Sequence, residues 1–172
     1  MLDEKKFAVV IERLIHQLLE NNISFEKTAI IGIQPRGVLL SKRIVDYIEN
    51  RLHISIEYGK LDITFYRDDF KTSNDLHLPV ATEIPFSIEN KKLILIDDVL
   101  YTGRTIRCAL DALLDFGRPN KVELLTLIDR RWSRELPIQP DYVGLTVDSL
   151  PTQKVKVHWK EKNNKDEVLL IE

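Results

Sequence analysis

The first third of the chain alternates between helical spacing and a short apolar run. Apolar residues recur every three or four positions over 7–19 and over 40–51. This spacing predicts two amphipathic helices, the first ending near Asn21. Residues 28–33 form an apolar run between them, which indicates a buried strand. The segment therefore predicts a helix, a strand and a second helix.

The next segment is less regular. Residues 53–58 alternate apolar and polar side chains, and residues 63–66 are short and β-prone. Gly59 and Lys60 lie between them, so two strands around a turn or one long strand both fit the pattern. Residues 68–90 are polar and lack a long helical period, which predicts a long loop. Part of this loop is compatible with β-structure. A loop of this length in a compact domain is usually functional or mobile.

Strands and helices continue to alternate in the second half. Residues 92–96 and 122–128 are apolar runs typical of buried strands, and 104–116 has helical spacing closed by Gly117. Further strands are predicted at 142–145, 155–159 and 168–171, with an irregular basic stretch at 130–140 and a turn at 161–167. The alternation predicts a single α/β domain over 1–172 with a mainly parallel sheet. Ligands in such folds bind at the carboxyl ends of the strands.

Composition adds mainly exclusions. The 172 residues carry a formal net charge of −2 and 44% hydrophobic residues, so no bulk basic excess points to nucleic acid. Cys108 is the single cysteine, which rules out an intrachain disulfide and reads as a packed thiol rather than a reactive one. The charged N-terminus lacks a secretory h-region, and no apolar run approaches the ~20 residues needed to span a bilayer. We expect a cytoplasmic protein without a membrane partner.

Residues 93–105 carry the clearest chemistry. An apolar strand delivers Asp97 and Asp98 to its C-terminal end, and a loop with Thr102, Gly103 and Thr105 leads into a helix. Backbone N–H groups at a helix N-terminus bind phosphate. The adjacent carboxylates suit the hydroxyls of a sugar or a Mg²⁺ reached through water. An isolated Asp-Asp pair more often shapes a strand-to-helix turn, so the whole string carries the interpretation.

The string resembles the phosphoribosyl-pyrophosphate (PRPP) motif of type I phosphoribosyltransferases. Other segments resemble the PyrR family of pyrimidine-operon attenuation regulators with uracil phosphoribosyltransferase activity, across essentially the whole chain. They lie at 62–69, 72–75, 97–105, 117–119 and 134–138. The resemblance implies a type I phosphoribosyltransferase fold, with helices flanking the sheet, a small hood mainly over 130–160 and a flexible active-site loop. It implies conversion of uracil and PRPP to UMP and pyrophosphate with Mg²⁺.

The resemblance also implies roles for individual residues. Asp97, Asp98 and Arg36 would be catalytic. The ribose and 5′-phosphate would contact Asp97, Asp98, Tyr101, Thr102, Gly103, Arg104 and Thr105. Pyrophosphate would contact Gln34, Arg36, Gly37 and Arg67. Asp129 and Arg130 would border the base, and Ser73 and Asn74 would help a flap close the site. Mg²⁺ would be held mainly through PRPP and water near Asp97 and Asp98, with no direct protein ligand.

The chain departs from the family pattern at two loops. Gln34-Pro35 stands where the family more often has Lys-Thr, although Arg36 and Gly37 remain. A plain turn with a solvated arginine is the simpler interpretation of this loop. The hood has Arg131-Trp132-Ser133 between Arg130 and Arg134, which is one residue longer than the family's Gly-His form. Trp132 fits a packed surface aromatic or a lid over the base equally well.

RNA binding is a separate expectation. Arg13 and His16 match basic positions of the family, which implies that they contact RNA. Asn21, Gln139 and Leu145 stand where the family often has arginine or lysine, and Arg131 and Arg134 would partly compensate for this loss. A solvated helix face is the simpler interpretation of Arg13. The alternatives to a uracil enzyme that senses UMP or UTP are a purely regulatory RNA-binding attenuator and a purine phosphoribosyltransferase. The family also implies a homodimer or tetramer.

Overall fold

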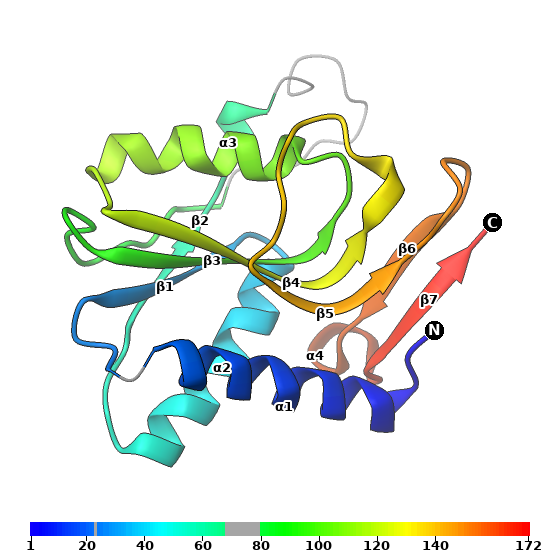
Figure 1. Cartoon of the computed structure of the whole chain (residues 1–172), viewed down its shortest axis with the longest axis horizontal. Coiled ribbons are helices and arrows are strands. Elements are labelled where there is room, and N and C mark those ends of the chain that lie inside the picture. Colours follow the sequence, from blue (N-terminus) through cyan, green and yellow to red (C-terminus); the bar gives the residue numbers. More distant parts are fainter. Residues whose placement is uncertain (23, 68–79) are drawn as a thin grey trace.

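The fold centres on a five-stranded, wholly parallel sheet (Figure 1), in a computed structural model that describes residues 1–22, 24–67 and 80–172. The strands lie in the order β2-β1-β3-β4-β5. Their bounds are β1 (Thr28–Ile33), β2 (Glu57–Leu61), β3 (Lys92–Leu100), β4 (Lys121–Arg130) and β5 (Tyr142–Val147). The predicted α/β class with a mainly parallel sheet is confirmed. Parallel neighbours need a crossover connection, and helices provide such connections here.

Helices cover both faces of this sheet. Helices α1 (Glu4–Asn21) and α2 (Gly37–Leu52) pack on one face, and α3 (Arg104–Leu113) packs on the other (Figure 1). Strand side chains alternate between the two layers, so Ile30 faces α1 and α2 whereas Ile31 faces α3. The strands are therefore buried on both sides, which explains why they read as continuous apolar runs.

A small antiparallel hairpin completes the chain. It consists of β6 (Lys154–His158) and β7 (Glu167–Ile171), with the short helix α4 (Lys160–Asn163) between them. An antiparallel bridge between Leu2 and Val168 brings the two termini together (Figure 1). The predicted turn at 161–167 is therefore partly helical.

The predicted strand at 63–66 is wrong. These residues lie in a 3₁₀ turn, η1 (Thr64–Tyr66), because the Asp62 carboxylate accepts hydrogen bonds from the backbone N–H and hydroxyl of Thr64 at 2.8 and 2.6 Å. Such a side-chain bond favours a turn over an extended strand. Gly59 lies inside β2, and β2 starts at Glu57 rather than at residue 53. In the described part of the long loop, residues 80–90, Glu83 forms an isolated bridge with Lys60.

Two further 3₁₀ turns follow a helix and a strand. They are η2 (Leu114–Phe116), which follows α3, and η3 (Arg131–Ser133), which follows β4. Cys108 is buried, as predicted for a packed thiol. None of the helices in the described parts of the chain combines the length and apolar character that crossing a membrane requires.

Candidate active site

The site lies where the order of the strands reverses. From β1 the chain moves outward to β2 and then returns to the other side of β1 as β3. Pairing of β1 with β3 ends at Gly32 and Ile96, whereas β4 still pairs with β3 as far as Leu100. Asp97 therefore lies beside the open end of β1, which is the usual position for a ligand in such sheets.

A cavity of about 640 Å³ opens at this reversal. Eight of the predicted site residues line it: Gln34, Arg36, Arg67, Asp97, Asp98, Tyr101, Thr105 and Arg130. The sequence analysis missed other lining residues, among them Asp62, Thr64, Val80, Lys154 and Val155. Lys154 and Val155 belong to the β6 hairpin, whose alternating pattern is equally typical of a solvated strand. The pattern therefore could not show that this strand borders the cavity.

Burial dominates the electrostatics of the two carboxylates. Asp97 and Asp98 are 8% and 6% exposed. Burial and the adjacent Asp98 charge raise the pKa of Asp97 to about 8. Burial also raises the pKa of Asp98, against the opposing effect of the positive Arg36. The two carboxyls therefore resist ionising together in the free protein, and a cation or a positively charged ligand would favour their ionised forms.

The loop after β3 encloses a second hollow of about 380 Å³. Residues 102–105 line it, together with Arg67 and Tyr101. Gly103 adopts a left-handed φ of 93°, and a β-carbon there would lie 3.3 Å from Ile138 and 3.4 Å from Leu136. Glycine thus allows both the turn and the close approach of the hood segment. Helix α3 begins at Arg104, so the positive end of its dipole borders the hollow.

Arg130 joins the loop to the hood. Its Cζ lies 3.9 Å from the centroid of the Tyr101 ring. Its guanidinium donates to Ser149 Oγ at 2.9 Å and to the carbonyl oxygen of Gln153 at 2.9 Å. The backbone N–H of Glu135 also donates to the Thr102 carbonyl at 2.9 Å. The hood segment therefore packs directly against the 102–105 loop.

Several predicted residues lie elsewhere. Gly37 packs under β3, because a β-carbon there would be 2.3 Å from the Ile96 carbonyl oxygen. Asp129 does not line either hollow and accepts from Arg134. Trp132 is 75% exposed and lies beside Arg131, outside both hollows. Ser73 and Asn74 of the predicted flap lie outside the described residues.

The four predicted RNA contacts are engaged within the protein. Arg131 binds both oxygens of Asp148, and Arg134 binds Asp129 and the Tyr101 carbonyl. On α1, Arg13 donates to the Gly144 carbonyl. His16 lies 4.0 Å from Glu12. Contact of these four residues with RNA stays a prediction.

Asp97 and Asp98 suit a metal cation that is bound mainly by a phosphate ligand. In the described residues no three acidic, histidine or cysteine side chains converge as a metal cage. Asp62, the other acid in the cavity wall, already accepts from Thr64 and from the Val80 backbone at 2.6 Å. Asp97 and Asp98 therefore remain as oxygen donors, a set that fits Mg²⁺ bound mainly by phosphate and water.

Known proteins share this fold, and some of them share more than 40% of the aligned residues. The family model "Phosphoribosyl transferase domain" matches residues 1–162. The bifunctional protein PyrR of Bacillus subtilis (strain 168) is 41% identical, over 100% of this chain and 96% of that protein. The bifunctional protein PyrR of Acetivibrio thermocellus is 47% identical, over 91% and 83% respectively.

Solved structures agree on the fold. A hypoxanthine phosphoribosyltransferase from Staphylococcus aureus superposes with a TM-score of 0.69 at 21% identity, over 100% of this chain and 90% of that one. The enzyme from Trypanosoma cruzi gives 0.75 at 13% identity, over 100% and 94%. These identities are too low to indicate the base. Identity over nearly the whole chain with the PyrR proteins, on a type I phosphoribosyltransferase fold, shows that the chain belongs to the PyrR family of phosphoribosyltransferase-domain proteins.

Proposed function

We propose that this protein is a uracil phosphoribosyltransferase, which converts uracil and PRPP to UMP and pyrophosphate. The observation that carries the proposal is the placement of Asp97 and Asp98 beside the 102–105 loop, in a cavity that Arg36 and Arg67 also line. The membership of the PyrR family supports uracil as the base.

In this proposal each part of the site has a separate role. The N-terminus of α3 and residues 102–105 bind the 5′-phosphate, which supplies remote binding energy for positioning the ribose. Asp97 and Asp98 hold the ribose hydroxyls and favour the positive charge that develops on the sugar in a glycosyl transfer. Arg36 stabilises the pyrophosphate as it leaves. Mg²⁺, bound through PRPP near the two carboxylates, supplies further stabilisation of negative charge.

Base choice is the first experiment. The purified protein is incubated with PRPP and Mg²⁺, and with uracil, cytosine, hypoxanthine or guanine in parallel. We expect nucleotide formation with uracil and none above background with the purines. Turnover with hypoxanthine but not with uracil would replace this proposal with a purine enzyme.

A second candidate function is regulation through RNA, with UMP or UTP as the sensed nucleotide. It is favoured by membership of the PyrR family. A salt titration with pyrimidine-leader RNA and a random RNA of equal length tests it, since a true site adds affinity beyond the counterion effect. Equal affinity for both RNAs would remove this role. Cytoplasmic location and a homodimer or tetramer remain predictions.

A further inference from the structure

Two buried polar atoms have no hydrogen-bond partner in the described parts of the chain. They are Oδ2 of Asp98 and Nε1 of Trp159. An indole N–H can only donate, and a carboxylate oxygen accepts. Buried polar groups in folded proteins are nearly always paired, so a lone donor and a lone acceptor near one active site need an explanation.

The fold brings the two side chains to the same place. Trp159 follows β6, and β6 contacts β3, which carries Asp98. The start of β6, at Lys154 and Val155, lines the same cavity as Asp98. The indole is also close enough to the carboxylate to lower the pKa of Asp98, against the larger effect of burial. The two side chains therefore lie close together, although neither Asp98 Oδ2 nor the Trp159 indole N–H has a hydrogen-bond partner in the structure.

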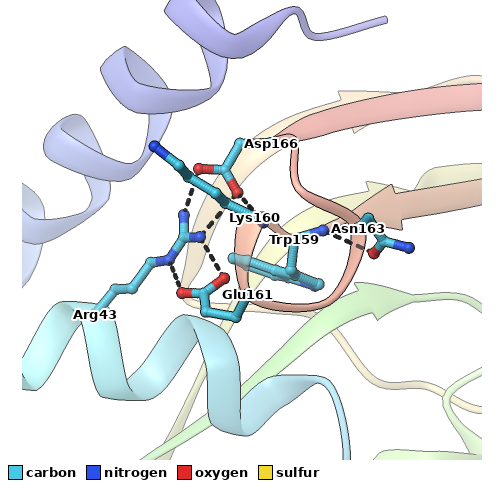
Figure 2. A network of polar contacts seen from close by, with 6 residues as sticks. All are labelled: Arg43, Trp159, Lys160, Glu161, Asn163 and Asp166. Atoms are coloured by element: carbon cyan, nitrogen blue, oxygen red, sulfur yellow. Dashed lines mark hydrogen bonds and ion pairs between the residues drawn. The ribbon is translucent and has the colours of Figure 1, made fainter.

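Trp159 is fixed by contacts with its neighbours, among them Arg43 and Asn163 (Figure 2). The Cζ of Arg43 lies 5.0 Å from the indole centroid, and the Phe7 ring meets it edge-on with centroids 5.3 Å apart. The Trp159 backbone N–H donates to Asn163 Oδ1 at 3.1 Å. With 1% of its surface exposed, the indole has little freedom to turn its N–H elsewhere.

Arg43 is itself fixed by two carboxylates of the C-terminal hairpin (Figure 2). Its Nε and Nη2 donate to Glu161 at 2.8 and 2.6 Å. Its Nη1 and Nη2 donate to Asp166 at 2.9 and 2.8 Å. Paired contacts of this kind set the orientation of a guanidinium. The network therefore clamps the hairpin, and Trp159 with it, onto α2.

We propose that Trp159 is a positioning residue for Asp98, whose Oδ2 accepts a hydrogen bond from the indole Nε1–H when the carboxylate takes its working orientation. The bond anchors one oxygen of Asp98 inside the protein, and the carboxylate is thereby held toward the cavity. The role in turnover rests on the proposed phosphoribosyltransferase function, whereas the bond itself is a property of the folded chain.

The bond is tested without any activity. The ¹⁵N-labelled protein with PRPP and Mg²⁺ shows two indole N–H resonances, and loss of one in Trp132→Phe assigns the other to Trp159. We expect Asp98→Asn to move the Trp159 resonance upfield, because a charged acceptor is lost, and the matched variant Asp97→Asn to move it much less. Equal displacement in the two variants, or none in Asp98→Asn, overturns the proposal.

Kinetics test the consequence. Trp159→Phe keeps an aromatic ring and removes the N–H, so we expect kcat to fall about tenfold, with a smaller change in the KM for PRPP. The control Phe7→Leu disturbs the same packing but keeps the donor, so it should lower Tm and leave kcat near wild type. A kcat in Trp159→Phe no lower than in Phe7→Leu overturns the positioning role. If Trp159→Phe does not fold, the resonance comparison decides. If wild type makes no nucleotide from any base, the proposed function fails while that comparison still stands.

Discussion

The carboxyl ends of β3 and β4 lie at the same edge of the sheet, yet the charges there are used differently. In the last part of β3, Asp97 and Asp98 line the cavity and form no ion pair with a described residue. After β4, Arg131 and Arg134 are each bound to a carboxylate of the protein. The difference teaches that the charges of Asp97 and Asp98 face the cavity, whereas those of Arg131 and Arg134 are already balanced within the protein.

The largest expected effect concerns the acids at the end of β3. We predict that Asp98→Asn lowers kcat for nucleotide formation by about 100-fold or more, because a charge that stabilises the transition state is lost. The Tm should change by only a few degrees. The surface variant Asp148→Asn is the control and should retain its turnover. Near-normal turnover in Asp98→Asn would contradict the site assignment.

The next prediction concerns Arg36, a cationic residue that lines the same cavity. It lines the cavity beside Asp97 and Asp98, and its positive charge opposes the rise in the pKa of both carboxyls. Arg36→Gln should lower kcat/KM for PRPP by about 10- to 100-fold, since a cation facing the leaving pyrophosphate is removed. Steady-state kinetics with varied PRPP measure it, and Arg131→Gln is the matched control. Similar losses in both variants would refute the contrast between the two loops.

Asp97 sharpens the comparison through pH. Its carboxyl ionises near pH 4 in an unfolded chain but near 8 in the protein, so folding takes up a proton between these values. The free energy of unfolding contributed by this group therefore falls as pH rises through that window. We expect Asp97→Asn to raise the Tm of the ligand-free protein more at pH 9 than at pH 4. Thermal unfolding across pH measures this, and parallel curves would contradict it.

The smallest effect distinguishes the two ion pairs after β4. Arg134 and Asp129 are 16% and 11% exposed, whereas Arg131 and Asp148 are 53% and 56% exposed. Arg134→Gln leaves a buried carboxylate unpaired and should cost about 1–3 kcal/mol of the free energy of unfolding. Arg131→Gln should cost less than about 1 kcal/mol. Urea unfolding of both variants provides the measurement, and a reversed order would contradict the burial argument.

Several elements could be predicted from the sequence because local and tertiary demands agree there. The apolar runs at 28–33 and 92–96 are strands, since a strand buried on both faces has no polar position to interrupt it. Helix α1 follows from its three-and-four spacing, capped by Asp3, which accepts from the Lys6 N–H at 2.9 Å. The turn at 64–66 could not be predicted in this way, because the Asp62 side chain overrides the β-prone residues.

The sequence by itself determined the loop at 102–105, the two acids before it and the alternation of buried strands and helices, since these depend on neighbours a few residues apart. Tertiary structure alone decided which charges remain available. It pairs Arg131 with Asp148, brings Lys154 to the cavity and carries the Trp159 indole to Asp98, 61 positions earlier. Contacts at such separation depend on strand order and hairpin packing, which no local pattern of polar and apolar residues encodes.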